Sequence, residues 1–343
     1  MNILAIDTSC DETSVAVTSG TQVLSNVISS QVRYHKKYGG VVPFLAQRLH
    51  RERIDAVIAL ALARADLDWS GIDAIAVTYG PGLAPALEVG LQKARDLAAK
   101  YRLPLYGVNH MAGHIASCFP FHDKAIEYPA LALLVSGGHT ELVRMQSFAD
   151  VEVVGQTLDD ALGEAYDKVS KMLGLGYPGG RLLSKLAKSG NSQAYSLPIP
   201  LQYSKDLNFS YSGLKNAVRL VIEEMKAAGP IRQKQICDLA ASFQEVAQVA
   251  VEKKVRLALR EYPDTRIVLM GGGVAANTVL RARIRKLGKE FRVPLVVPAR
   301  LNLCSDNAAM IGVAAYFGIQ AGQQPVLPEL LDRKPGLALG QAS

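Results

Sequence analysis

An internal repeat constrains the fold of this chain more than any other feature of its sequence. Near the start, the segment ILAIDTSCDETSVAV reads as an apolar strand, a small polar turn over Thr8 to Asp11 and a second apolar strand. Much later, the segment LALLVSGGHTELVRM reads the same way. Two apolar strands joined by a tight polar turn are typical of a β-hairpin. A hairpin pattern that recurs predicts two domains that begin alike.

Each repeat opens a region of mixed strands and helices. The first region is expected to contain a strand over 73–78, a helix over 85–100 and a strand over 105–108. In the second region, an expected strand over 266–270 runs into three glycines and a helix that begins near Ala276. Strands that alternate with helices predict an α/β fold, with ligand-binding loops at the strand ends.

The domain limits follow from composition. The segment PFHDKAIEYP at 120–129 is polar, ends in proline and precedes the second repeat, so it favours a boundary. We predict a first domain over 1–125 with a helical insert near 38–63, completed by a helix near 306–321. A second domain is predicted over 126–305, with a helical insert near 159–235. Prolines in the remaining tail, 322–343, predict that this segment is poorly ordered.

Composition narrows the class of protein. With 49% hydrophobic and 20% charged residues, the chain has the composition of a soluble folded protein. No apolar run approaches the roughly 20 residues that a membrane span needs, and no leader is evident, so we expect a cytoplasmic protein that uses no membrane. The net charge of +7 favours a polyanionic partner. A basic run such as 281–286 is equally compatible with a solvated helix face.

The segment NHMAGH indicates a metal site. His110 and His114 are four residues apart, so a helix presents both imidazoles on one face, although core positions explain them equally well. A zinc protease of this type needs Glu directly after the first histidine, where this chain has Met111. Asp306, in LCSDNAAMIGVAA, is either the N-cap of an apolar helix or a third ligand. Two histidines and one carboxylate with open positions suit iron(II) or zinc.

Two glycine-rich loops indicate a nucleotide site. The segment Ser136-Gly137-Gly138 lies at the second hairpin, where glycines let backbone N–H groups approach a phosphate; an ordinary tight turn is the alternative. The segment Gly271-Gly272-Gly273 lies between a strand and a helix, a geometry that aims a helix N-terminus at an anion. Asn277, just inside that helix, is either a ligand-binding residue or a helix cap.

An acidic stripe lies between these two loops. Asp160, Glu164 and Asp167 fall at i, i+4 and i+7 of an expected helix. Such a stripe is usually a solvated face. The alternative is that Asp167 accepts hydrogen bonds from ribose hydroxyls, while Gly179-Gly180 leaves room for the sugar. Together with the glycine-rich loops, this pattern favours a nucleotide ligand.

Taken together, these segments resemble a known family, the tRNA N6-adenosine threonylcarbamoyltransferases. The resemblance is carried, in the family's order, by AIDTSCDETS, YGGVVP, GPGLAPAL, NHMAGH, LLVSGGHTELV, DDALGEAYDKVSKMLGLGYPGG, FSYSGLK, GGGVAAN and CSDNAAMI. These motifs span nearly the whole chain, so the resemblance is highly specific. It implies the α/β fold of actin, Hsp70 and sugar kinases, with two ribonuclease-H-like domains, helical insertions and nucleotide in a central cleft.

The resemblance also implies roles for particular residues. His110, His114 and Asp306 match the family's metal ligands, which usually hold iron. Positions that hold the nucleotide-like substrate match Leu134, Val135, Ser136, Gly137, Gly138, Asp167, Gly180 and Asn277. The implied substrate is threonylcarbamoyl-adenylate, and the acceptor is N6 of adenosine 37, beside the anticodon, in tRNAs that read codons beginning with A. Bacterial relatives act with a paralogous dimer partner (TsaB) and an ATPase (TsaE).

Two positions depart from the family's pattern. Bacterial members commonly read VVPELASRDH where this chain reads VVPFLAQRLH, so Phe44 replaces an acidic residue. The helix that carries Phe44 is expected to line the site entrance or a partner surface, so this change is expected to alter contacts there. Ala112 replaces a frequent glutamate that is not a metal ligand in the pattern.

The reaction implied is an acyl transfer, for which Asp11 on the first polar turn is our candidate general base. Three other functions compete with it. A sugar kinase or ATPase of the same fold gives no role to the metal ligands. A metalloprotease lacks the general base expected at Met111. A non-catalytic scaffold paralogue is expected to have lost the metal ligands, which this chain retains.

Overall fold

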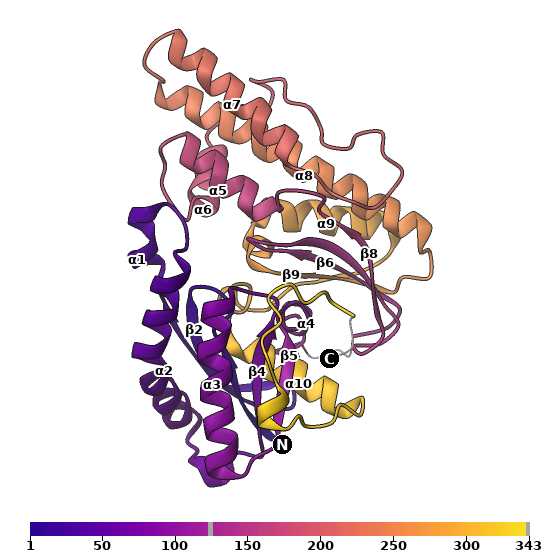
Figure 1. Ribbon diagram of the computed structural model, residues 1–343. Helices are drawn as coiled ribbons and strands as arrows, with labels where there is room; N and C mark the ends of the chain where they lie inside the picture. The colour runs from indigo at the N-terminus through magenta and orange to yellow at the C-terminus, as the bar shows by residue number, and fades with distance from the viewer. Residues whose placement is uncertain (123–125, 341–343) are drawn as a thin grey trace. The chain divides into compact units, whose positions relative to one another are not determined.

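Two compact units divide the chain in the computed structural model, which describes residues 1–122 and 126–340 (Figure 1). Unit 1 comprises Met1–Glu127, Met145–Glu152 and Val297–Ser343, and unit 2 comprises Tyr128–Arg144 and Val153–Val296. The domain boundary expected at 125 and 126 touches 123–125, which lie outside the described residues, so the predicted domain limits stay a prediction.

The sheet of unit 1 has the strand order β3-β2-β1-β4-β5. Its strands are β1 (Asn2–Asp7), β2 (Glu12–Ser19), β3 (Gln22–Ser30), β4 (Ala74–Gly80) and β5 (Leu105–Asn109). β1 pairs antiparallel with β2 and parallel with β4, and β4 pairs parallel with β5. The carboxyl ends of β1, β4 and β5 therefore meet at one edge of the sheet, and the strands expected in this half are confirmed.

Helices cover both faces of this sheet, because its central strands are apolar on both sides. Leu4 and Ile6 of β1 belong to a core cluster with α2 (Pro43–Ala65) and α3 (Ala84–Tyr101). Ile3 and Ala5 point to the opposite face and belong to a cluster with α10 (Ala308–Gln320). On that face α4 (His110–Ala116) packs against α10. A short helix, α1 (Val32–His35), precedes α2.

The sheet of unit 2 repeats the arrangement of the first. Its strands are β6 (Ala130–Val135), β7 (Thr140–Met145), β8 (Val151–Gln156), β9 (Ile267–Gly271) and β10 (Leu295–Val296). The order β8-β7-β6-β9-β10 corresponds to β3-β2-β1-β4-β5, with the repeated hairpin at the same place. β6 pairs parallel with β9, and β9 with β10. The sequence repeat is therefore a structural duplication, and the predicted α/β fold is confirmed.

The helices of unit 2 are α5 (Leu162–Met172), α6 (Gly180–Ala187), α7 (Ser212–Ala227), α8 (Gln233–Glu261) and α9 (Thr278–Phe291). The helix expected near Ala276 begins slightly later, as α9, after a 3₁₀ turn over Gly273–Ala276. In the part of the chain that the structure describes, no helix combines the length and the apolar character needed to span a membrane.

The prediction of a poorly ordered tail is wrong for residues 322–340, while 341–343 lie outside the described residues. The N–H of Lys334 donates to the carbonyl of Tyr79 at 2.7 Å. Leu331 and Leu337 are each 5% exposed and join the core of unit 1. The proline content of the tail says nothing about these leucines, because their burial depends on residues far away in the sequence.

Gly80→Ala is expected to destabilise unit 1, because a Cβ atom at Gly80 would meet the backbone carbonyl of Lys334 in the tail. We expect the free energy of unfolding to fall by about 1–3 kcal/mol and the tail to be cleaved faster by proteases. Gly336→Ala is the matched control, since a Cβ atom there has open space. Urea denaturation and limited proteolysis test this; a Gly80→Ala protein that behaves like the control would contradict it.

Candidate functional site

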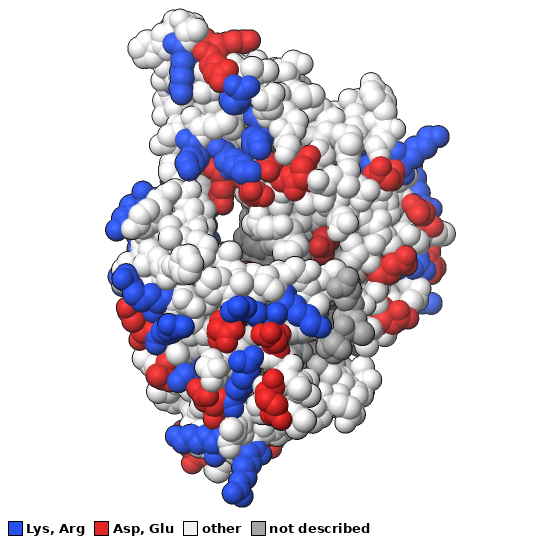
Figure 2. All heavy atoms as spheres, viewed as in Figure 1, with Lys and Arg blue, Asp and Glu red and all other residues white. Residues whose placement is uncertain are grey.

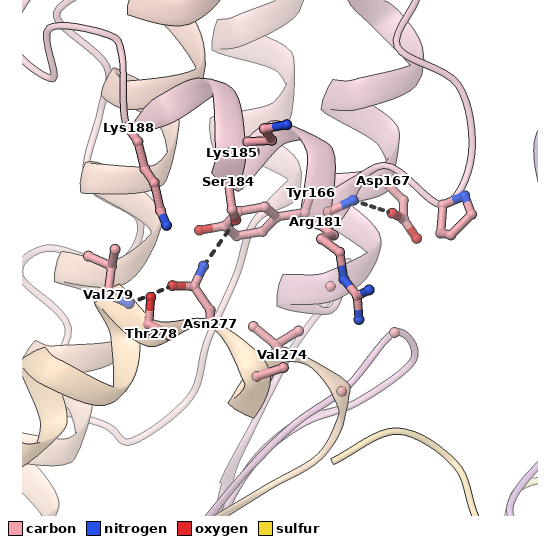
Figure 3. A pocket seen from close by; sticks show the side chains of 16 residues that line it. Tyr166, Asp167, Arg181, Ser184, Lys185, Lys188, Val274, Asn277, Thr278 and Val279 are labelled. Atoms are coloured by element: carbon pink, nitrogen blue, oxygen red, sulfur yellow. Dashed lines mark hydrogen bonds between the residues drawn. The ribbon is translucent and has the colours of Figure 1, made fainter. Parts of the chain in front are cut away.

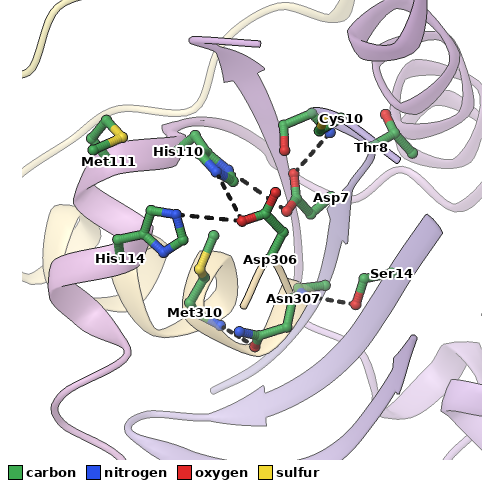
Figure 4. A network of polar contacts seen from close by, with 12 residues as sticks. Asp7, Thr8, Cys10, Ser14, His110, Met111, His114, Asp306, Asn307 and Met310 are labelled. Carbon is green, nitrogen blue, oxygen red and sulfur yellow. Dashed lines mark hydrogen bonds and ion pairs between the residues drawn. The ribbon is translucent and has the colours of Figure 1, made fainter. Parts of the chain in front are cut away.

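Three ionisable side chains of unit 1 form a group that could hold a metal ion (Figure 4). His110 and His114 come from α4, which follows β5, and Asp306 precedes α10. The Nε2 atoms of His110 and His114 lie 3.5 and 3.4 Å from the same atom, Oδ1 of Asp306. Two ligand atoms about 2.1 Å from one tetrahedral metal ion are roughly 3.4 Å apart. The residues expected as metal ligands are therefore brought together at separations that suit a metal.

A side-chain cap places the two histidines. The Oδ1 atom of Asn109 accepts a hydrogen bond from the N–H of Met111 at 2.8 Å, so α4 begins with His110 as its first residue. A Cβ atom at Gly113 would lie 2.8 Å from Cδ1 of Ile311, so glycine at this position allows α4 to pack closely against α10. The cap and the close packing together hold the histidines at the end of β5.

A second cap leaves the carboxylate of Asp306 available. The sequence left this residue as either a helix cap or a ligand. Asn307 supplies the cap of α10, because its Oδ1 atom accepts from the N–H of Met310 at 3.2 Å. The N–H of Ala308 donates to Oγ of Ser14 at 2.8 Å, which ties the start of α10 to β2. Asp306 therefore directs its carboxylate at the histidines, as Figure 4 shows.

Burial and opposite charge set the protonation of the group. Burial lowers the pKa of His110, but Asp306 and Asp7 outweigh that effect and raise the pKa to about 10. For His114 burial prevails, and the pKa is lowered. Burial opposes ionisation of Asp306, yet the two histidines hold its pKa well below its usual range. Asp306 is therefore ionised and His114 neutral at neutral pH, the forms in which these side chains bind a metal, whereas His110 is protonated and must release a proton when a metal binds.

Asp7 contacts this group and was missed by sequence reasoning. It is fully buried at the end of β1, and its Oδ2 atom lies 3.6 Å from Nδ1 of His110. Its Oδ1 atom accepts from the N–H of Ser9 at 3.1 Å. A carboxylate at Nδ1 favours the tautomer that leaves Nε2 free to face a metal. The signal available in the sequence was an acidic residue at the carboxyl end of the first apolar strand.

Asp11, the candidate general base, lies in the turn between β1 and β2. It is buried, and its backbone carbonyl accepts from the N–H of Gln31 at 2.9 Å. Burial, and then the charge of Asp11, raise the pKa of the Cys10 thiol and of the Glu12 carboxyl well above their usual ranges. Asp11 is not a member of the three-residue metal group, and its role as a base stays a prediction.

A pocket of about 470 Å³ lies in unit 2, beside α6 and the start of α9 (Figure 3). This volume is suited to a ligand of nucleotide size. Among the residues expected to hold a nucleotide, those that line the pocket are Gly137, Asp167, Gly180 and Asn277. Half of the predicted set is thus brought to one cavity, together with Gly273 of the second glycine-rich loop.

The other predicted residues lie at the strand end and hairpin next to Gly137, and they are Leu134, Val135, Ser136 and Gly138. Leu134 and Val135 are buried in β6. The Oγ atom of Ser136 accepts from the N–H of His139 at 3.1 Å, so this loop is a tight turn. Gly272 has φ 92°, and a Cβ atom there would meet the carbonyl of Val135, so the two glycine-rich loops are in close contact.

Asp167 supports the start of α6. Its Oδ1 atom accepts from the N–H groups of Gly179 at 2.8 Å and Gly180 at 2.9 Å. A Cβ atom at Gly180 would lie 3.5 Å from Cβ of Tyr166, which is ordinary contact, so this glycine is not required by crowding from the protein. Asp167 thus orders the loop that enters the pocket, and its contact with a ribose stays a prediction.

The expected acidic stripe is partly wrong. Asp160 precedes α5 rather than lying on it, because the helix begins at Leu162. Lys168 and Lys215 contact the two carboxylate oxygens of Asp160 at 2.7 and 2.6 Å. Glu164 pairs with Lys168 at 2.8 Å. These two acids are therefore engaged in ion pairs, whereas Asp167 reaches the pocket.

Asn277 connects three helices at the pocket wall. Its Oδ1 atom caps α9 by accepting from the N–H groups of Val279 (3.0 Å) and Leu280 (3.2 Å). Its Nδ2 atom donates to Oγ of Ser184 on α6 (3.1 Å) and to Oε1 of Gln244 on α8 (3.2 Å), and Figure 3 shows the bond to Ser184. The alternative of a helix cap is therefore confirmed, and a direct contact with ligand stays a prediction.

Basic side chains on one side of the pocket were also missed. Arg181, Lys185 and Lys188 recur at i, i+4 and i+7 from α6 into its C-cap, and all three line the cavity (Figure 3). Their spacing in GGRLLSKLAKS was the available signal. Positive charge at this wall favours an anionic ligand.

Similarity in sequence relates the chain to one family. The family model for tRNA N6-adenosine threonylcarbamoyltransferase matches residues 22–313. A curated protein of that name from Clostridium beijerinckii is 46% identical, over 99% of this chain and 98% of its own length. A protein of the same name from Moorella thermoacetica is 45% identical, over 98% of this chain and 97% of its own length.

Similarity to solved structures concerns the fold alone. The structure of T. kodakarensis HypF has a TM-score of 0.63 at 14% identity, over 93% of this chain and 48% of that chain. Component A of (R)-2-hydroxyglutaryl-CoA dehydratase from Acidaminococcus fermentans has a TM-score of 0.53 at 13% identity, over 94% of this chain and 100% of that chain. With the duplicated sheets, these similarities confirm the predicted fold class of actin, Hsp70 and sugar kinases.

Asp7→Asn is expected to weaken metal binding about 10- to 100-fold, because it removes the charge that holds the Nδ1 proton of His110. Titration calorimetry with Zn²⁺, and the absorption spectrum of bound Co²⁺, measure this effect. Asp73→Asn is the matched control, since Asp73 has a 59% exposed side chain near the opposite end of β1. Equal affinities for Asp7→Asn and the wild type would contradict the role of Asp7.

Proposed function

This chain belongs to the tRNA N6-adenosine threonylcarbamoyltransferase family, and on that premise we propose that it transfers a threonylcarbamoyl group to N6 of an adenosine in tRNA. One observation carries this proposal beyond the family relationship. His110, His114 and Asp306 converge as a metal group in a chain that matches its transferase relatives over nearly its full length. The enzyme is therefore an acyltransferase that modifies tRNA.

The assignment of the donor, the acceptor and the products follows from the chemistry of the donor, which is a mixed anhydride. The donor is threonylcarbamoyl-adenylate, and the acceptor is adenosine 37 of tRNAs that read codons beginning with A. The N6 amine attacks the carbamoyl carbon, the bond from that carbon to the phosphate oxygen breaks, and AMP leaves with the electron pair. The amine loses one proton, so the products are the modified adenosine, t6A, and AMP.

In this proposal the pocket of unit 2 holds the adenylate. Gly137 and Gly273 present backbone without side chains at the cavity wall, so the nucleotide approaches N–H groups closely. Asp167 orders the loop at Gly180 and accepts from the ribose hydroxyls. A fixed leaving group orients the carbonyl toward the amine, which reduces the entropy cost of reaction.

The metal group has a separate task in unit 1. His110, His114 and Asp306 would hold one divalent ion, which we assign as iron(II) with zinc as the alternative, and which would supply Lewis acidity for an oxygen of the donor. Asp7 orients His110 through Nδ1. Asp11 remains the candidate for accepting the amine proton, because it is a buried acid on the turn that follows Asp7.

Each competing function leaves observed residues without a role or lacks a residue that it needs. A sugar kinase or ATPase gives no role to the metal group. A metalloprotease of the two-histidine type needs a general base where Met111 stands, and Met111 is buried with 1% exposure. A scaffold paralogue does not require the metal ligands to converge. A paralogous partner, an ATPase partner and a cytoplasmic location belong to the proposal as predictions from the family.

His110→Ala is expected to reduce transfer of labelled threonylcarbamoyl from its adenylate to tRNA by at least about a hundredfold, because a metal ligand is lost. The assay supplies the adenylate, metal ion and candidate partner proteins. His122→Ala is the matched control, since His122 is exposed, lies outside the metal group and has its Nε2 atom 3.0 Å from the carbonyl oxygen of Val297. A folded His110→Ala protein with normal transfer would falsify the metal role.

No transfer by the wild type, under conditions in which a known relative is active, would reject the transferase function itself. Consumption of ATP that depends on a sugar would instead identify a kinase. These two outcomes separate the proposed activity from the assignment of the metal ligands.

A further inference from the structure

A basic segment of unit 1 has no role in the function described so far. We call residues 31–53 the basic arm; it contains α1, a 3₁₀ turn over Lys36–Tyr38 and the first turns of α2. It carries six Lys and Arg side chains, while its one acidic residue is Glu52. Exposed members of the set are Arg33, Lys36, Lys37, Arg48 and Arg51. Arg48 approaches Glu52 at 3.6 Å, so most of this charge is not neutralised within the arm.

Aromatic side chains lie among these cations. Tyr38 is 54% exposed, and Phe44, the residue that departs from the family's pattern, is 78% exposed. The Nζ atom of Lys37 lies 4.9 Å from the ring centroid of Tyr38. The guanidinium carbons of Arg33 and Arg53 lie 4.6 and 4.9 Å from the centroid of Tyr34. Cations and ring faces therefore alternate on a surface that is open to water.

The arm is anchored at the turn beside the metal group. The N–H of Gln31 donates to the carbonyl of Asp11 at 2.9 Å. His50 on α2 is fully buried; its Nε2 atom lies 3.0 Å from the carbonyl of Cys10, and its Nδ1 atom lies 2.8 Å from Oγ1 of Thr13. This turn follows Asp7, so Gln31 and His50 of the arm contact the segment that directly follows the residue facing His110.

We propose that the basic arm binds the tRNA loop that presents the acceptor adenosine, with cations on the phosphates and Tyr38 and Phe44 stacked on unpaired bases. This inference rests on the proposed function, because it takes tRNA as the substrate. Single-stranded RNA is held by positive surface along its backbone and by aromatic side chains under its bases. The arm offers both features within one segment of unit 1.

Other occupants fit the arm less well. The cores of protein interfaces are depleted in lysine, whereas the tip of the arm contains the adjacent pair Lys36 and Lys37. The adenylate donor has a single phosphate, so it could pair with only part of the positive charge that is spread along the arm. The exposed basic residues Arg285 and Lys286 on α9 have no exposed aromatic side chain on the same helix, so that surface serves as the comparison.

The test measures the dissociation constant of unmodified tRNA, without donor, across a range of salt concentrations. The full chain is used alone and with its candidate partners. Lys36→Ala combined with Lys37→Ala is expected to weaken binding about tenfold, and to reduce the slope of log affinity against log salt by about one to two units. Arg285→Ala combined with Lys286→Ala removes equal charge and is expected to change binding less than about twofold.

The aromatic part of the inference has its own variant. Phe44→Ala is expected to weaken tRNA binding about fivefold or more, with an unchanged salt slope, because stacking involves no counterion release. Phe44→Tyr is expected to restore the affinity, since it keeps the ring. Circular dichroism and metal content check that each variant is folded.

The outcomes separate the inference from the proposed function. If the wild type binds and modifies tRNA and the arm variants bind as tightly as the α9 control, the inference is wrong and the proposed function stands. If Phe44→Ala leaves tRNA affinity intact but weakens association with a protein partner, the arm is a protein interface and the inference is wrong. If the wild type neither binds nor modifies tRNA, the proposed function fails and the inference fails with it.

Discussion

The buried contact between Asp7 and His110 is the constraint on which the organisation of unit 1 depends. A carboxylate and an imidazole withdrawn from water are costly unless each is paired with an opposite charge or a hydrogen-bond partner. The sheet allows that pairing because β1 and β5 end at the same edge, on either side of β4. Asn109 and Asn307 then cap the helices that follow, so the histidines and Asp306 face the same point. The two caps and the packing of the helices therefore hold the side chains of the metal group in fixed positions.

Patterns among residues that are close together in the sequence predicted most of the fold and part of the site. The hairpin repeat and the spacing of His110 and His114 are visible because each lies within a short segment. The contact of Asp7 with His110 joins residues far apart in the chain, and no periodicity reports it. The choice between cap and ligand for Asp306 was also undecidable locally, because Asn307 is an equally good cap by residue type. The side-chain hydrogen bonds show that Asn307 is the cap, and the role of Asp306 as a ligand stays a prediction.

Helical spacing of residues also failed to predict where a helix begins. Asp160 has helical spacing from Glu164, yet α5 begins at Leu162, and Asp160 pairs with two lysines. The tail illustrates the same limit, because the burial of Leu331 and Leu337 requires the core of unit 1 to exist already. In both cases a local pattern is outweighed by contacts that bring distant segments together.

The duplicated fold carries different chemistry at equivalent positions. The turn after β1 follows Asp7 and contains Asp11, and buried acids of this kind attract cations and repel phosphate. The equivalent turn after β6 contains Ser136, Gly137 and Gly138, and it lacks acidic side chains, so an anion can approach its backbone N–H groups. One hairpin topology thus lies beside a group that could hold a metal in unit 1 and beside a pocket of nucleotide size in unit 2. The proposed transfer would use both, because backbone N–H groups suit the leaving phosphate and a bound metal ion would stabilise charge on an oxygen of the donor.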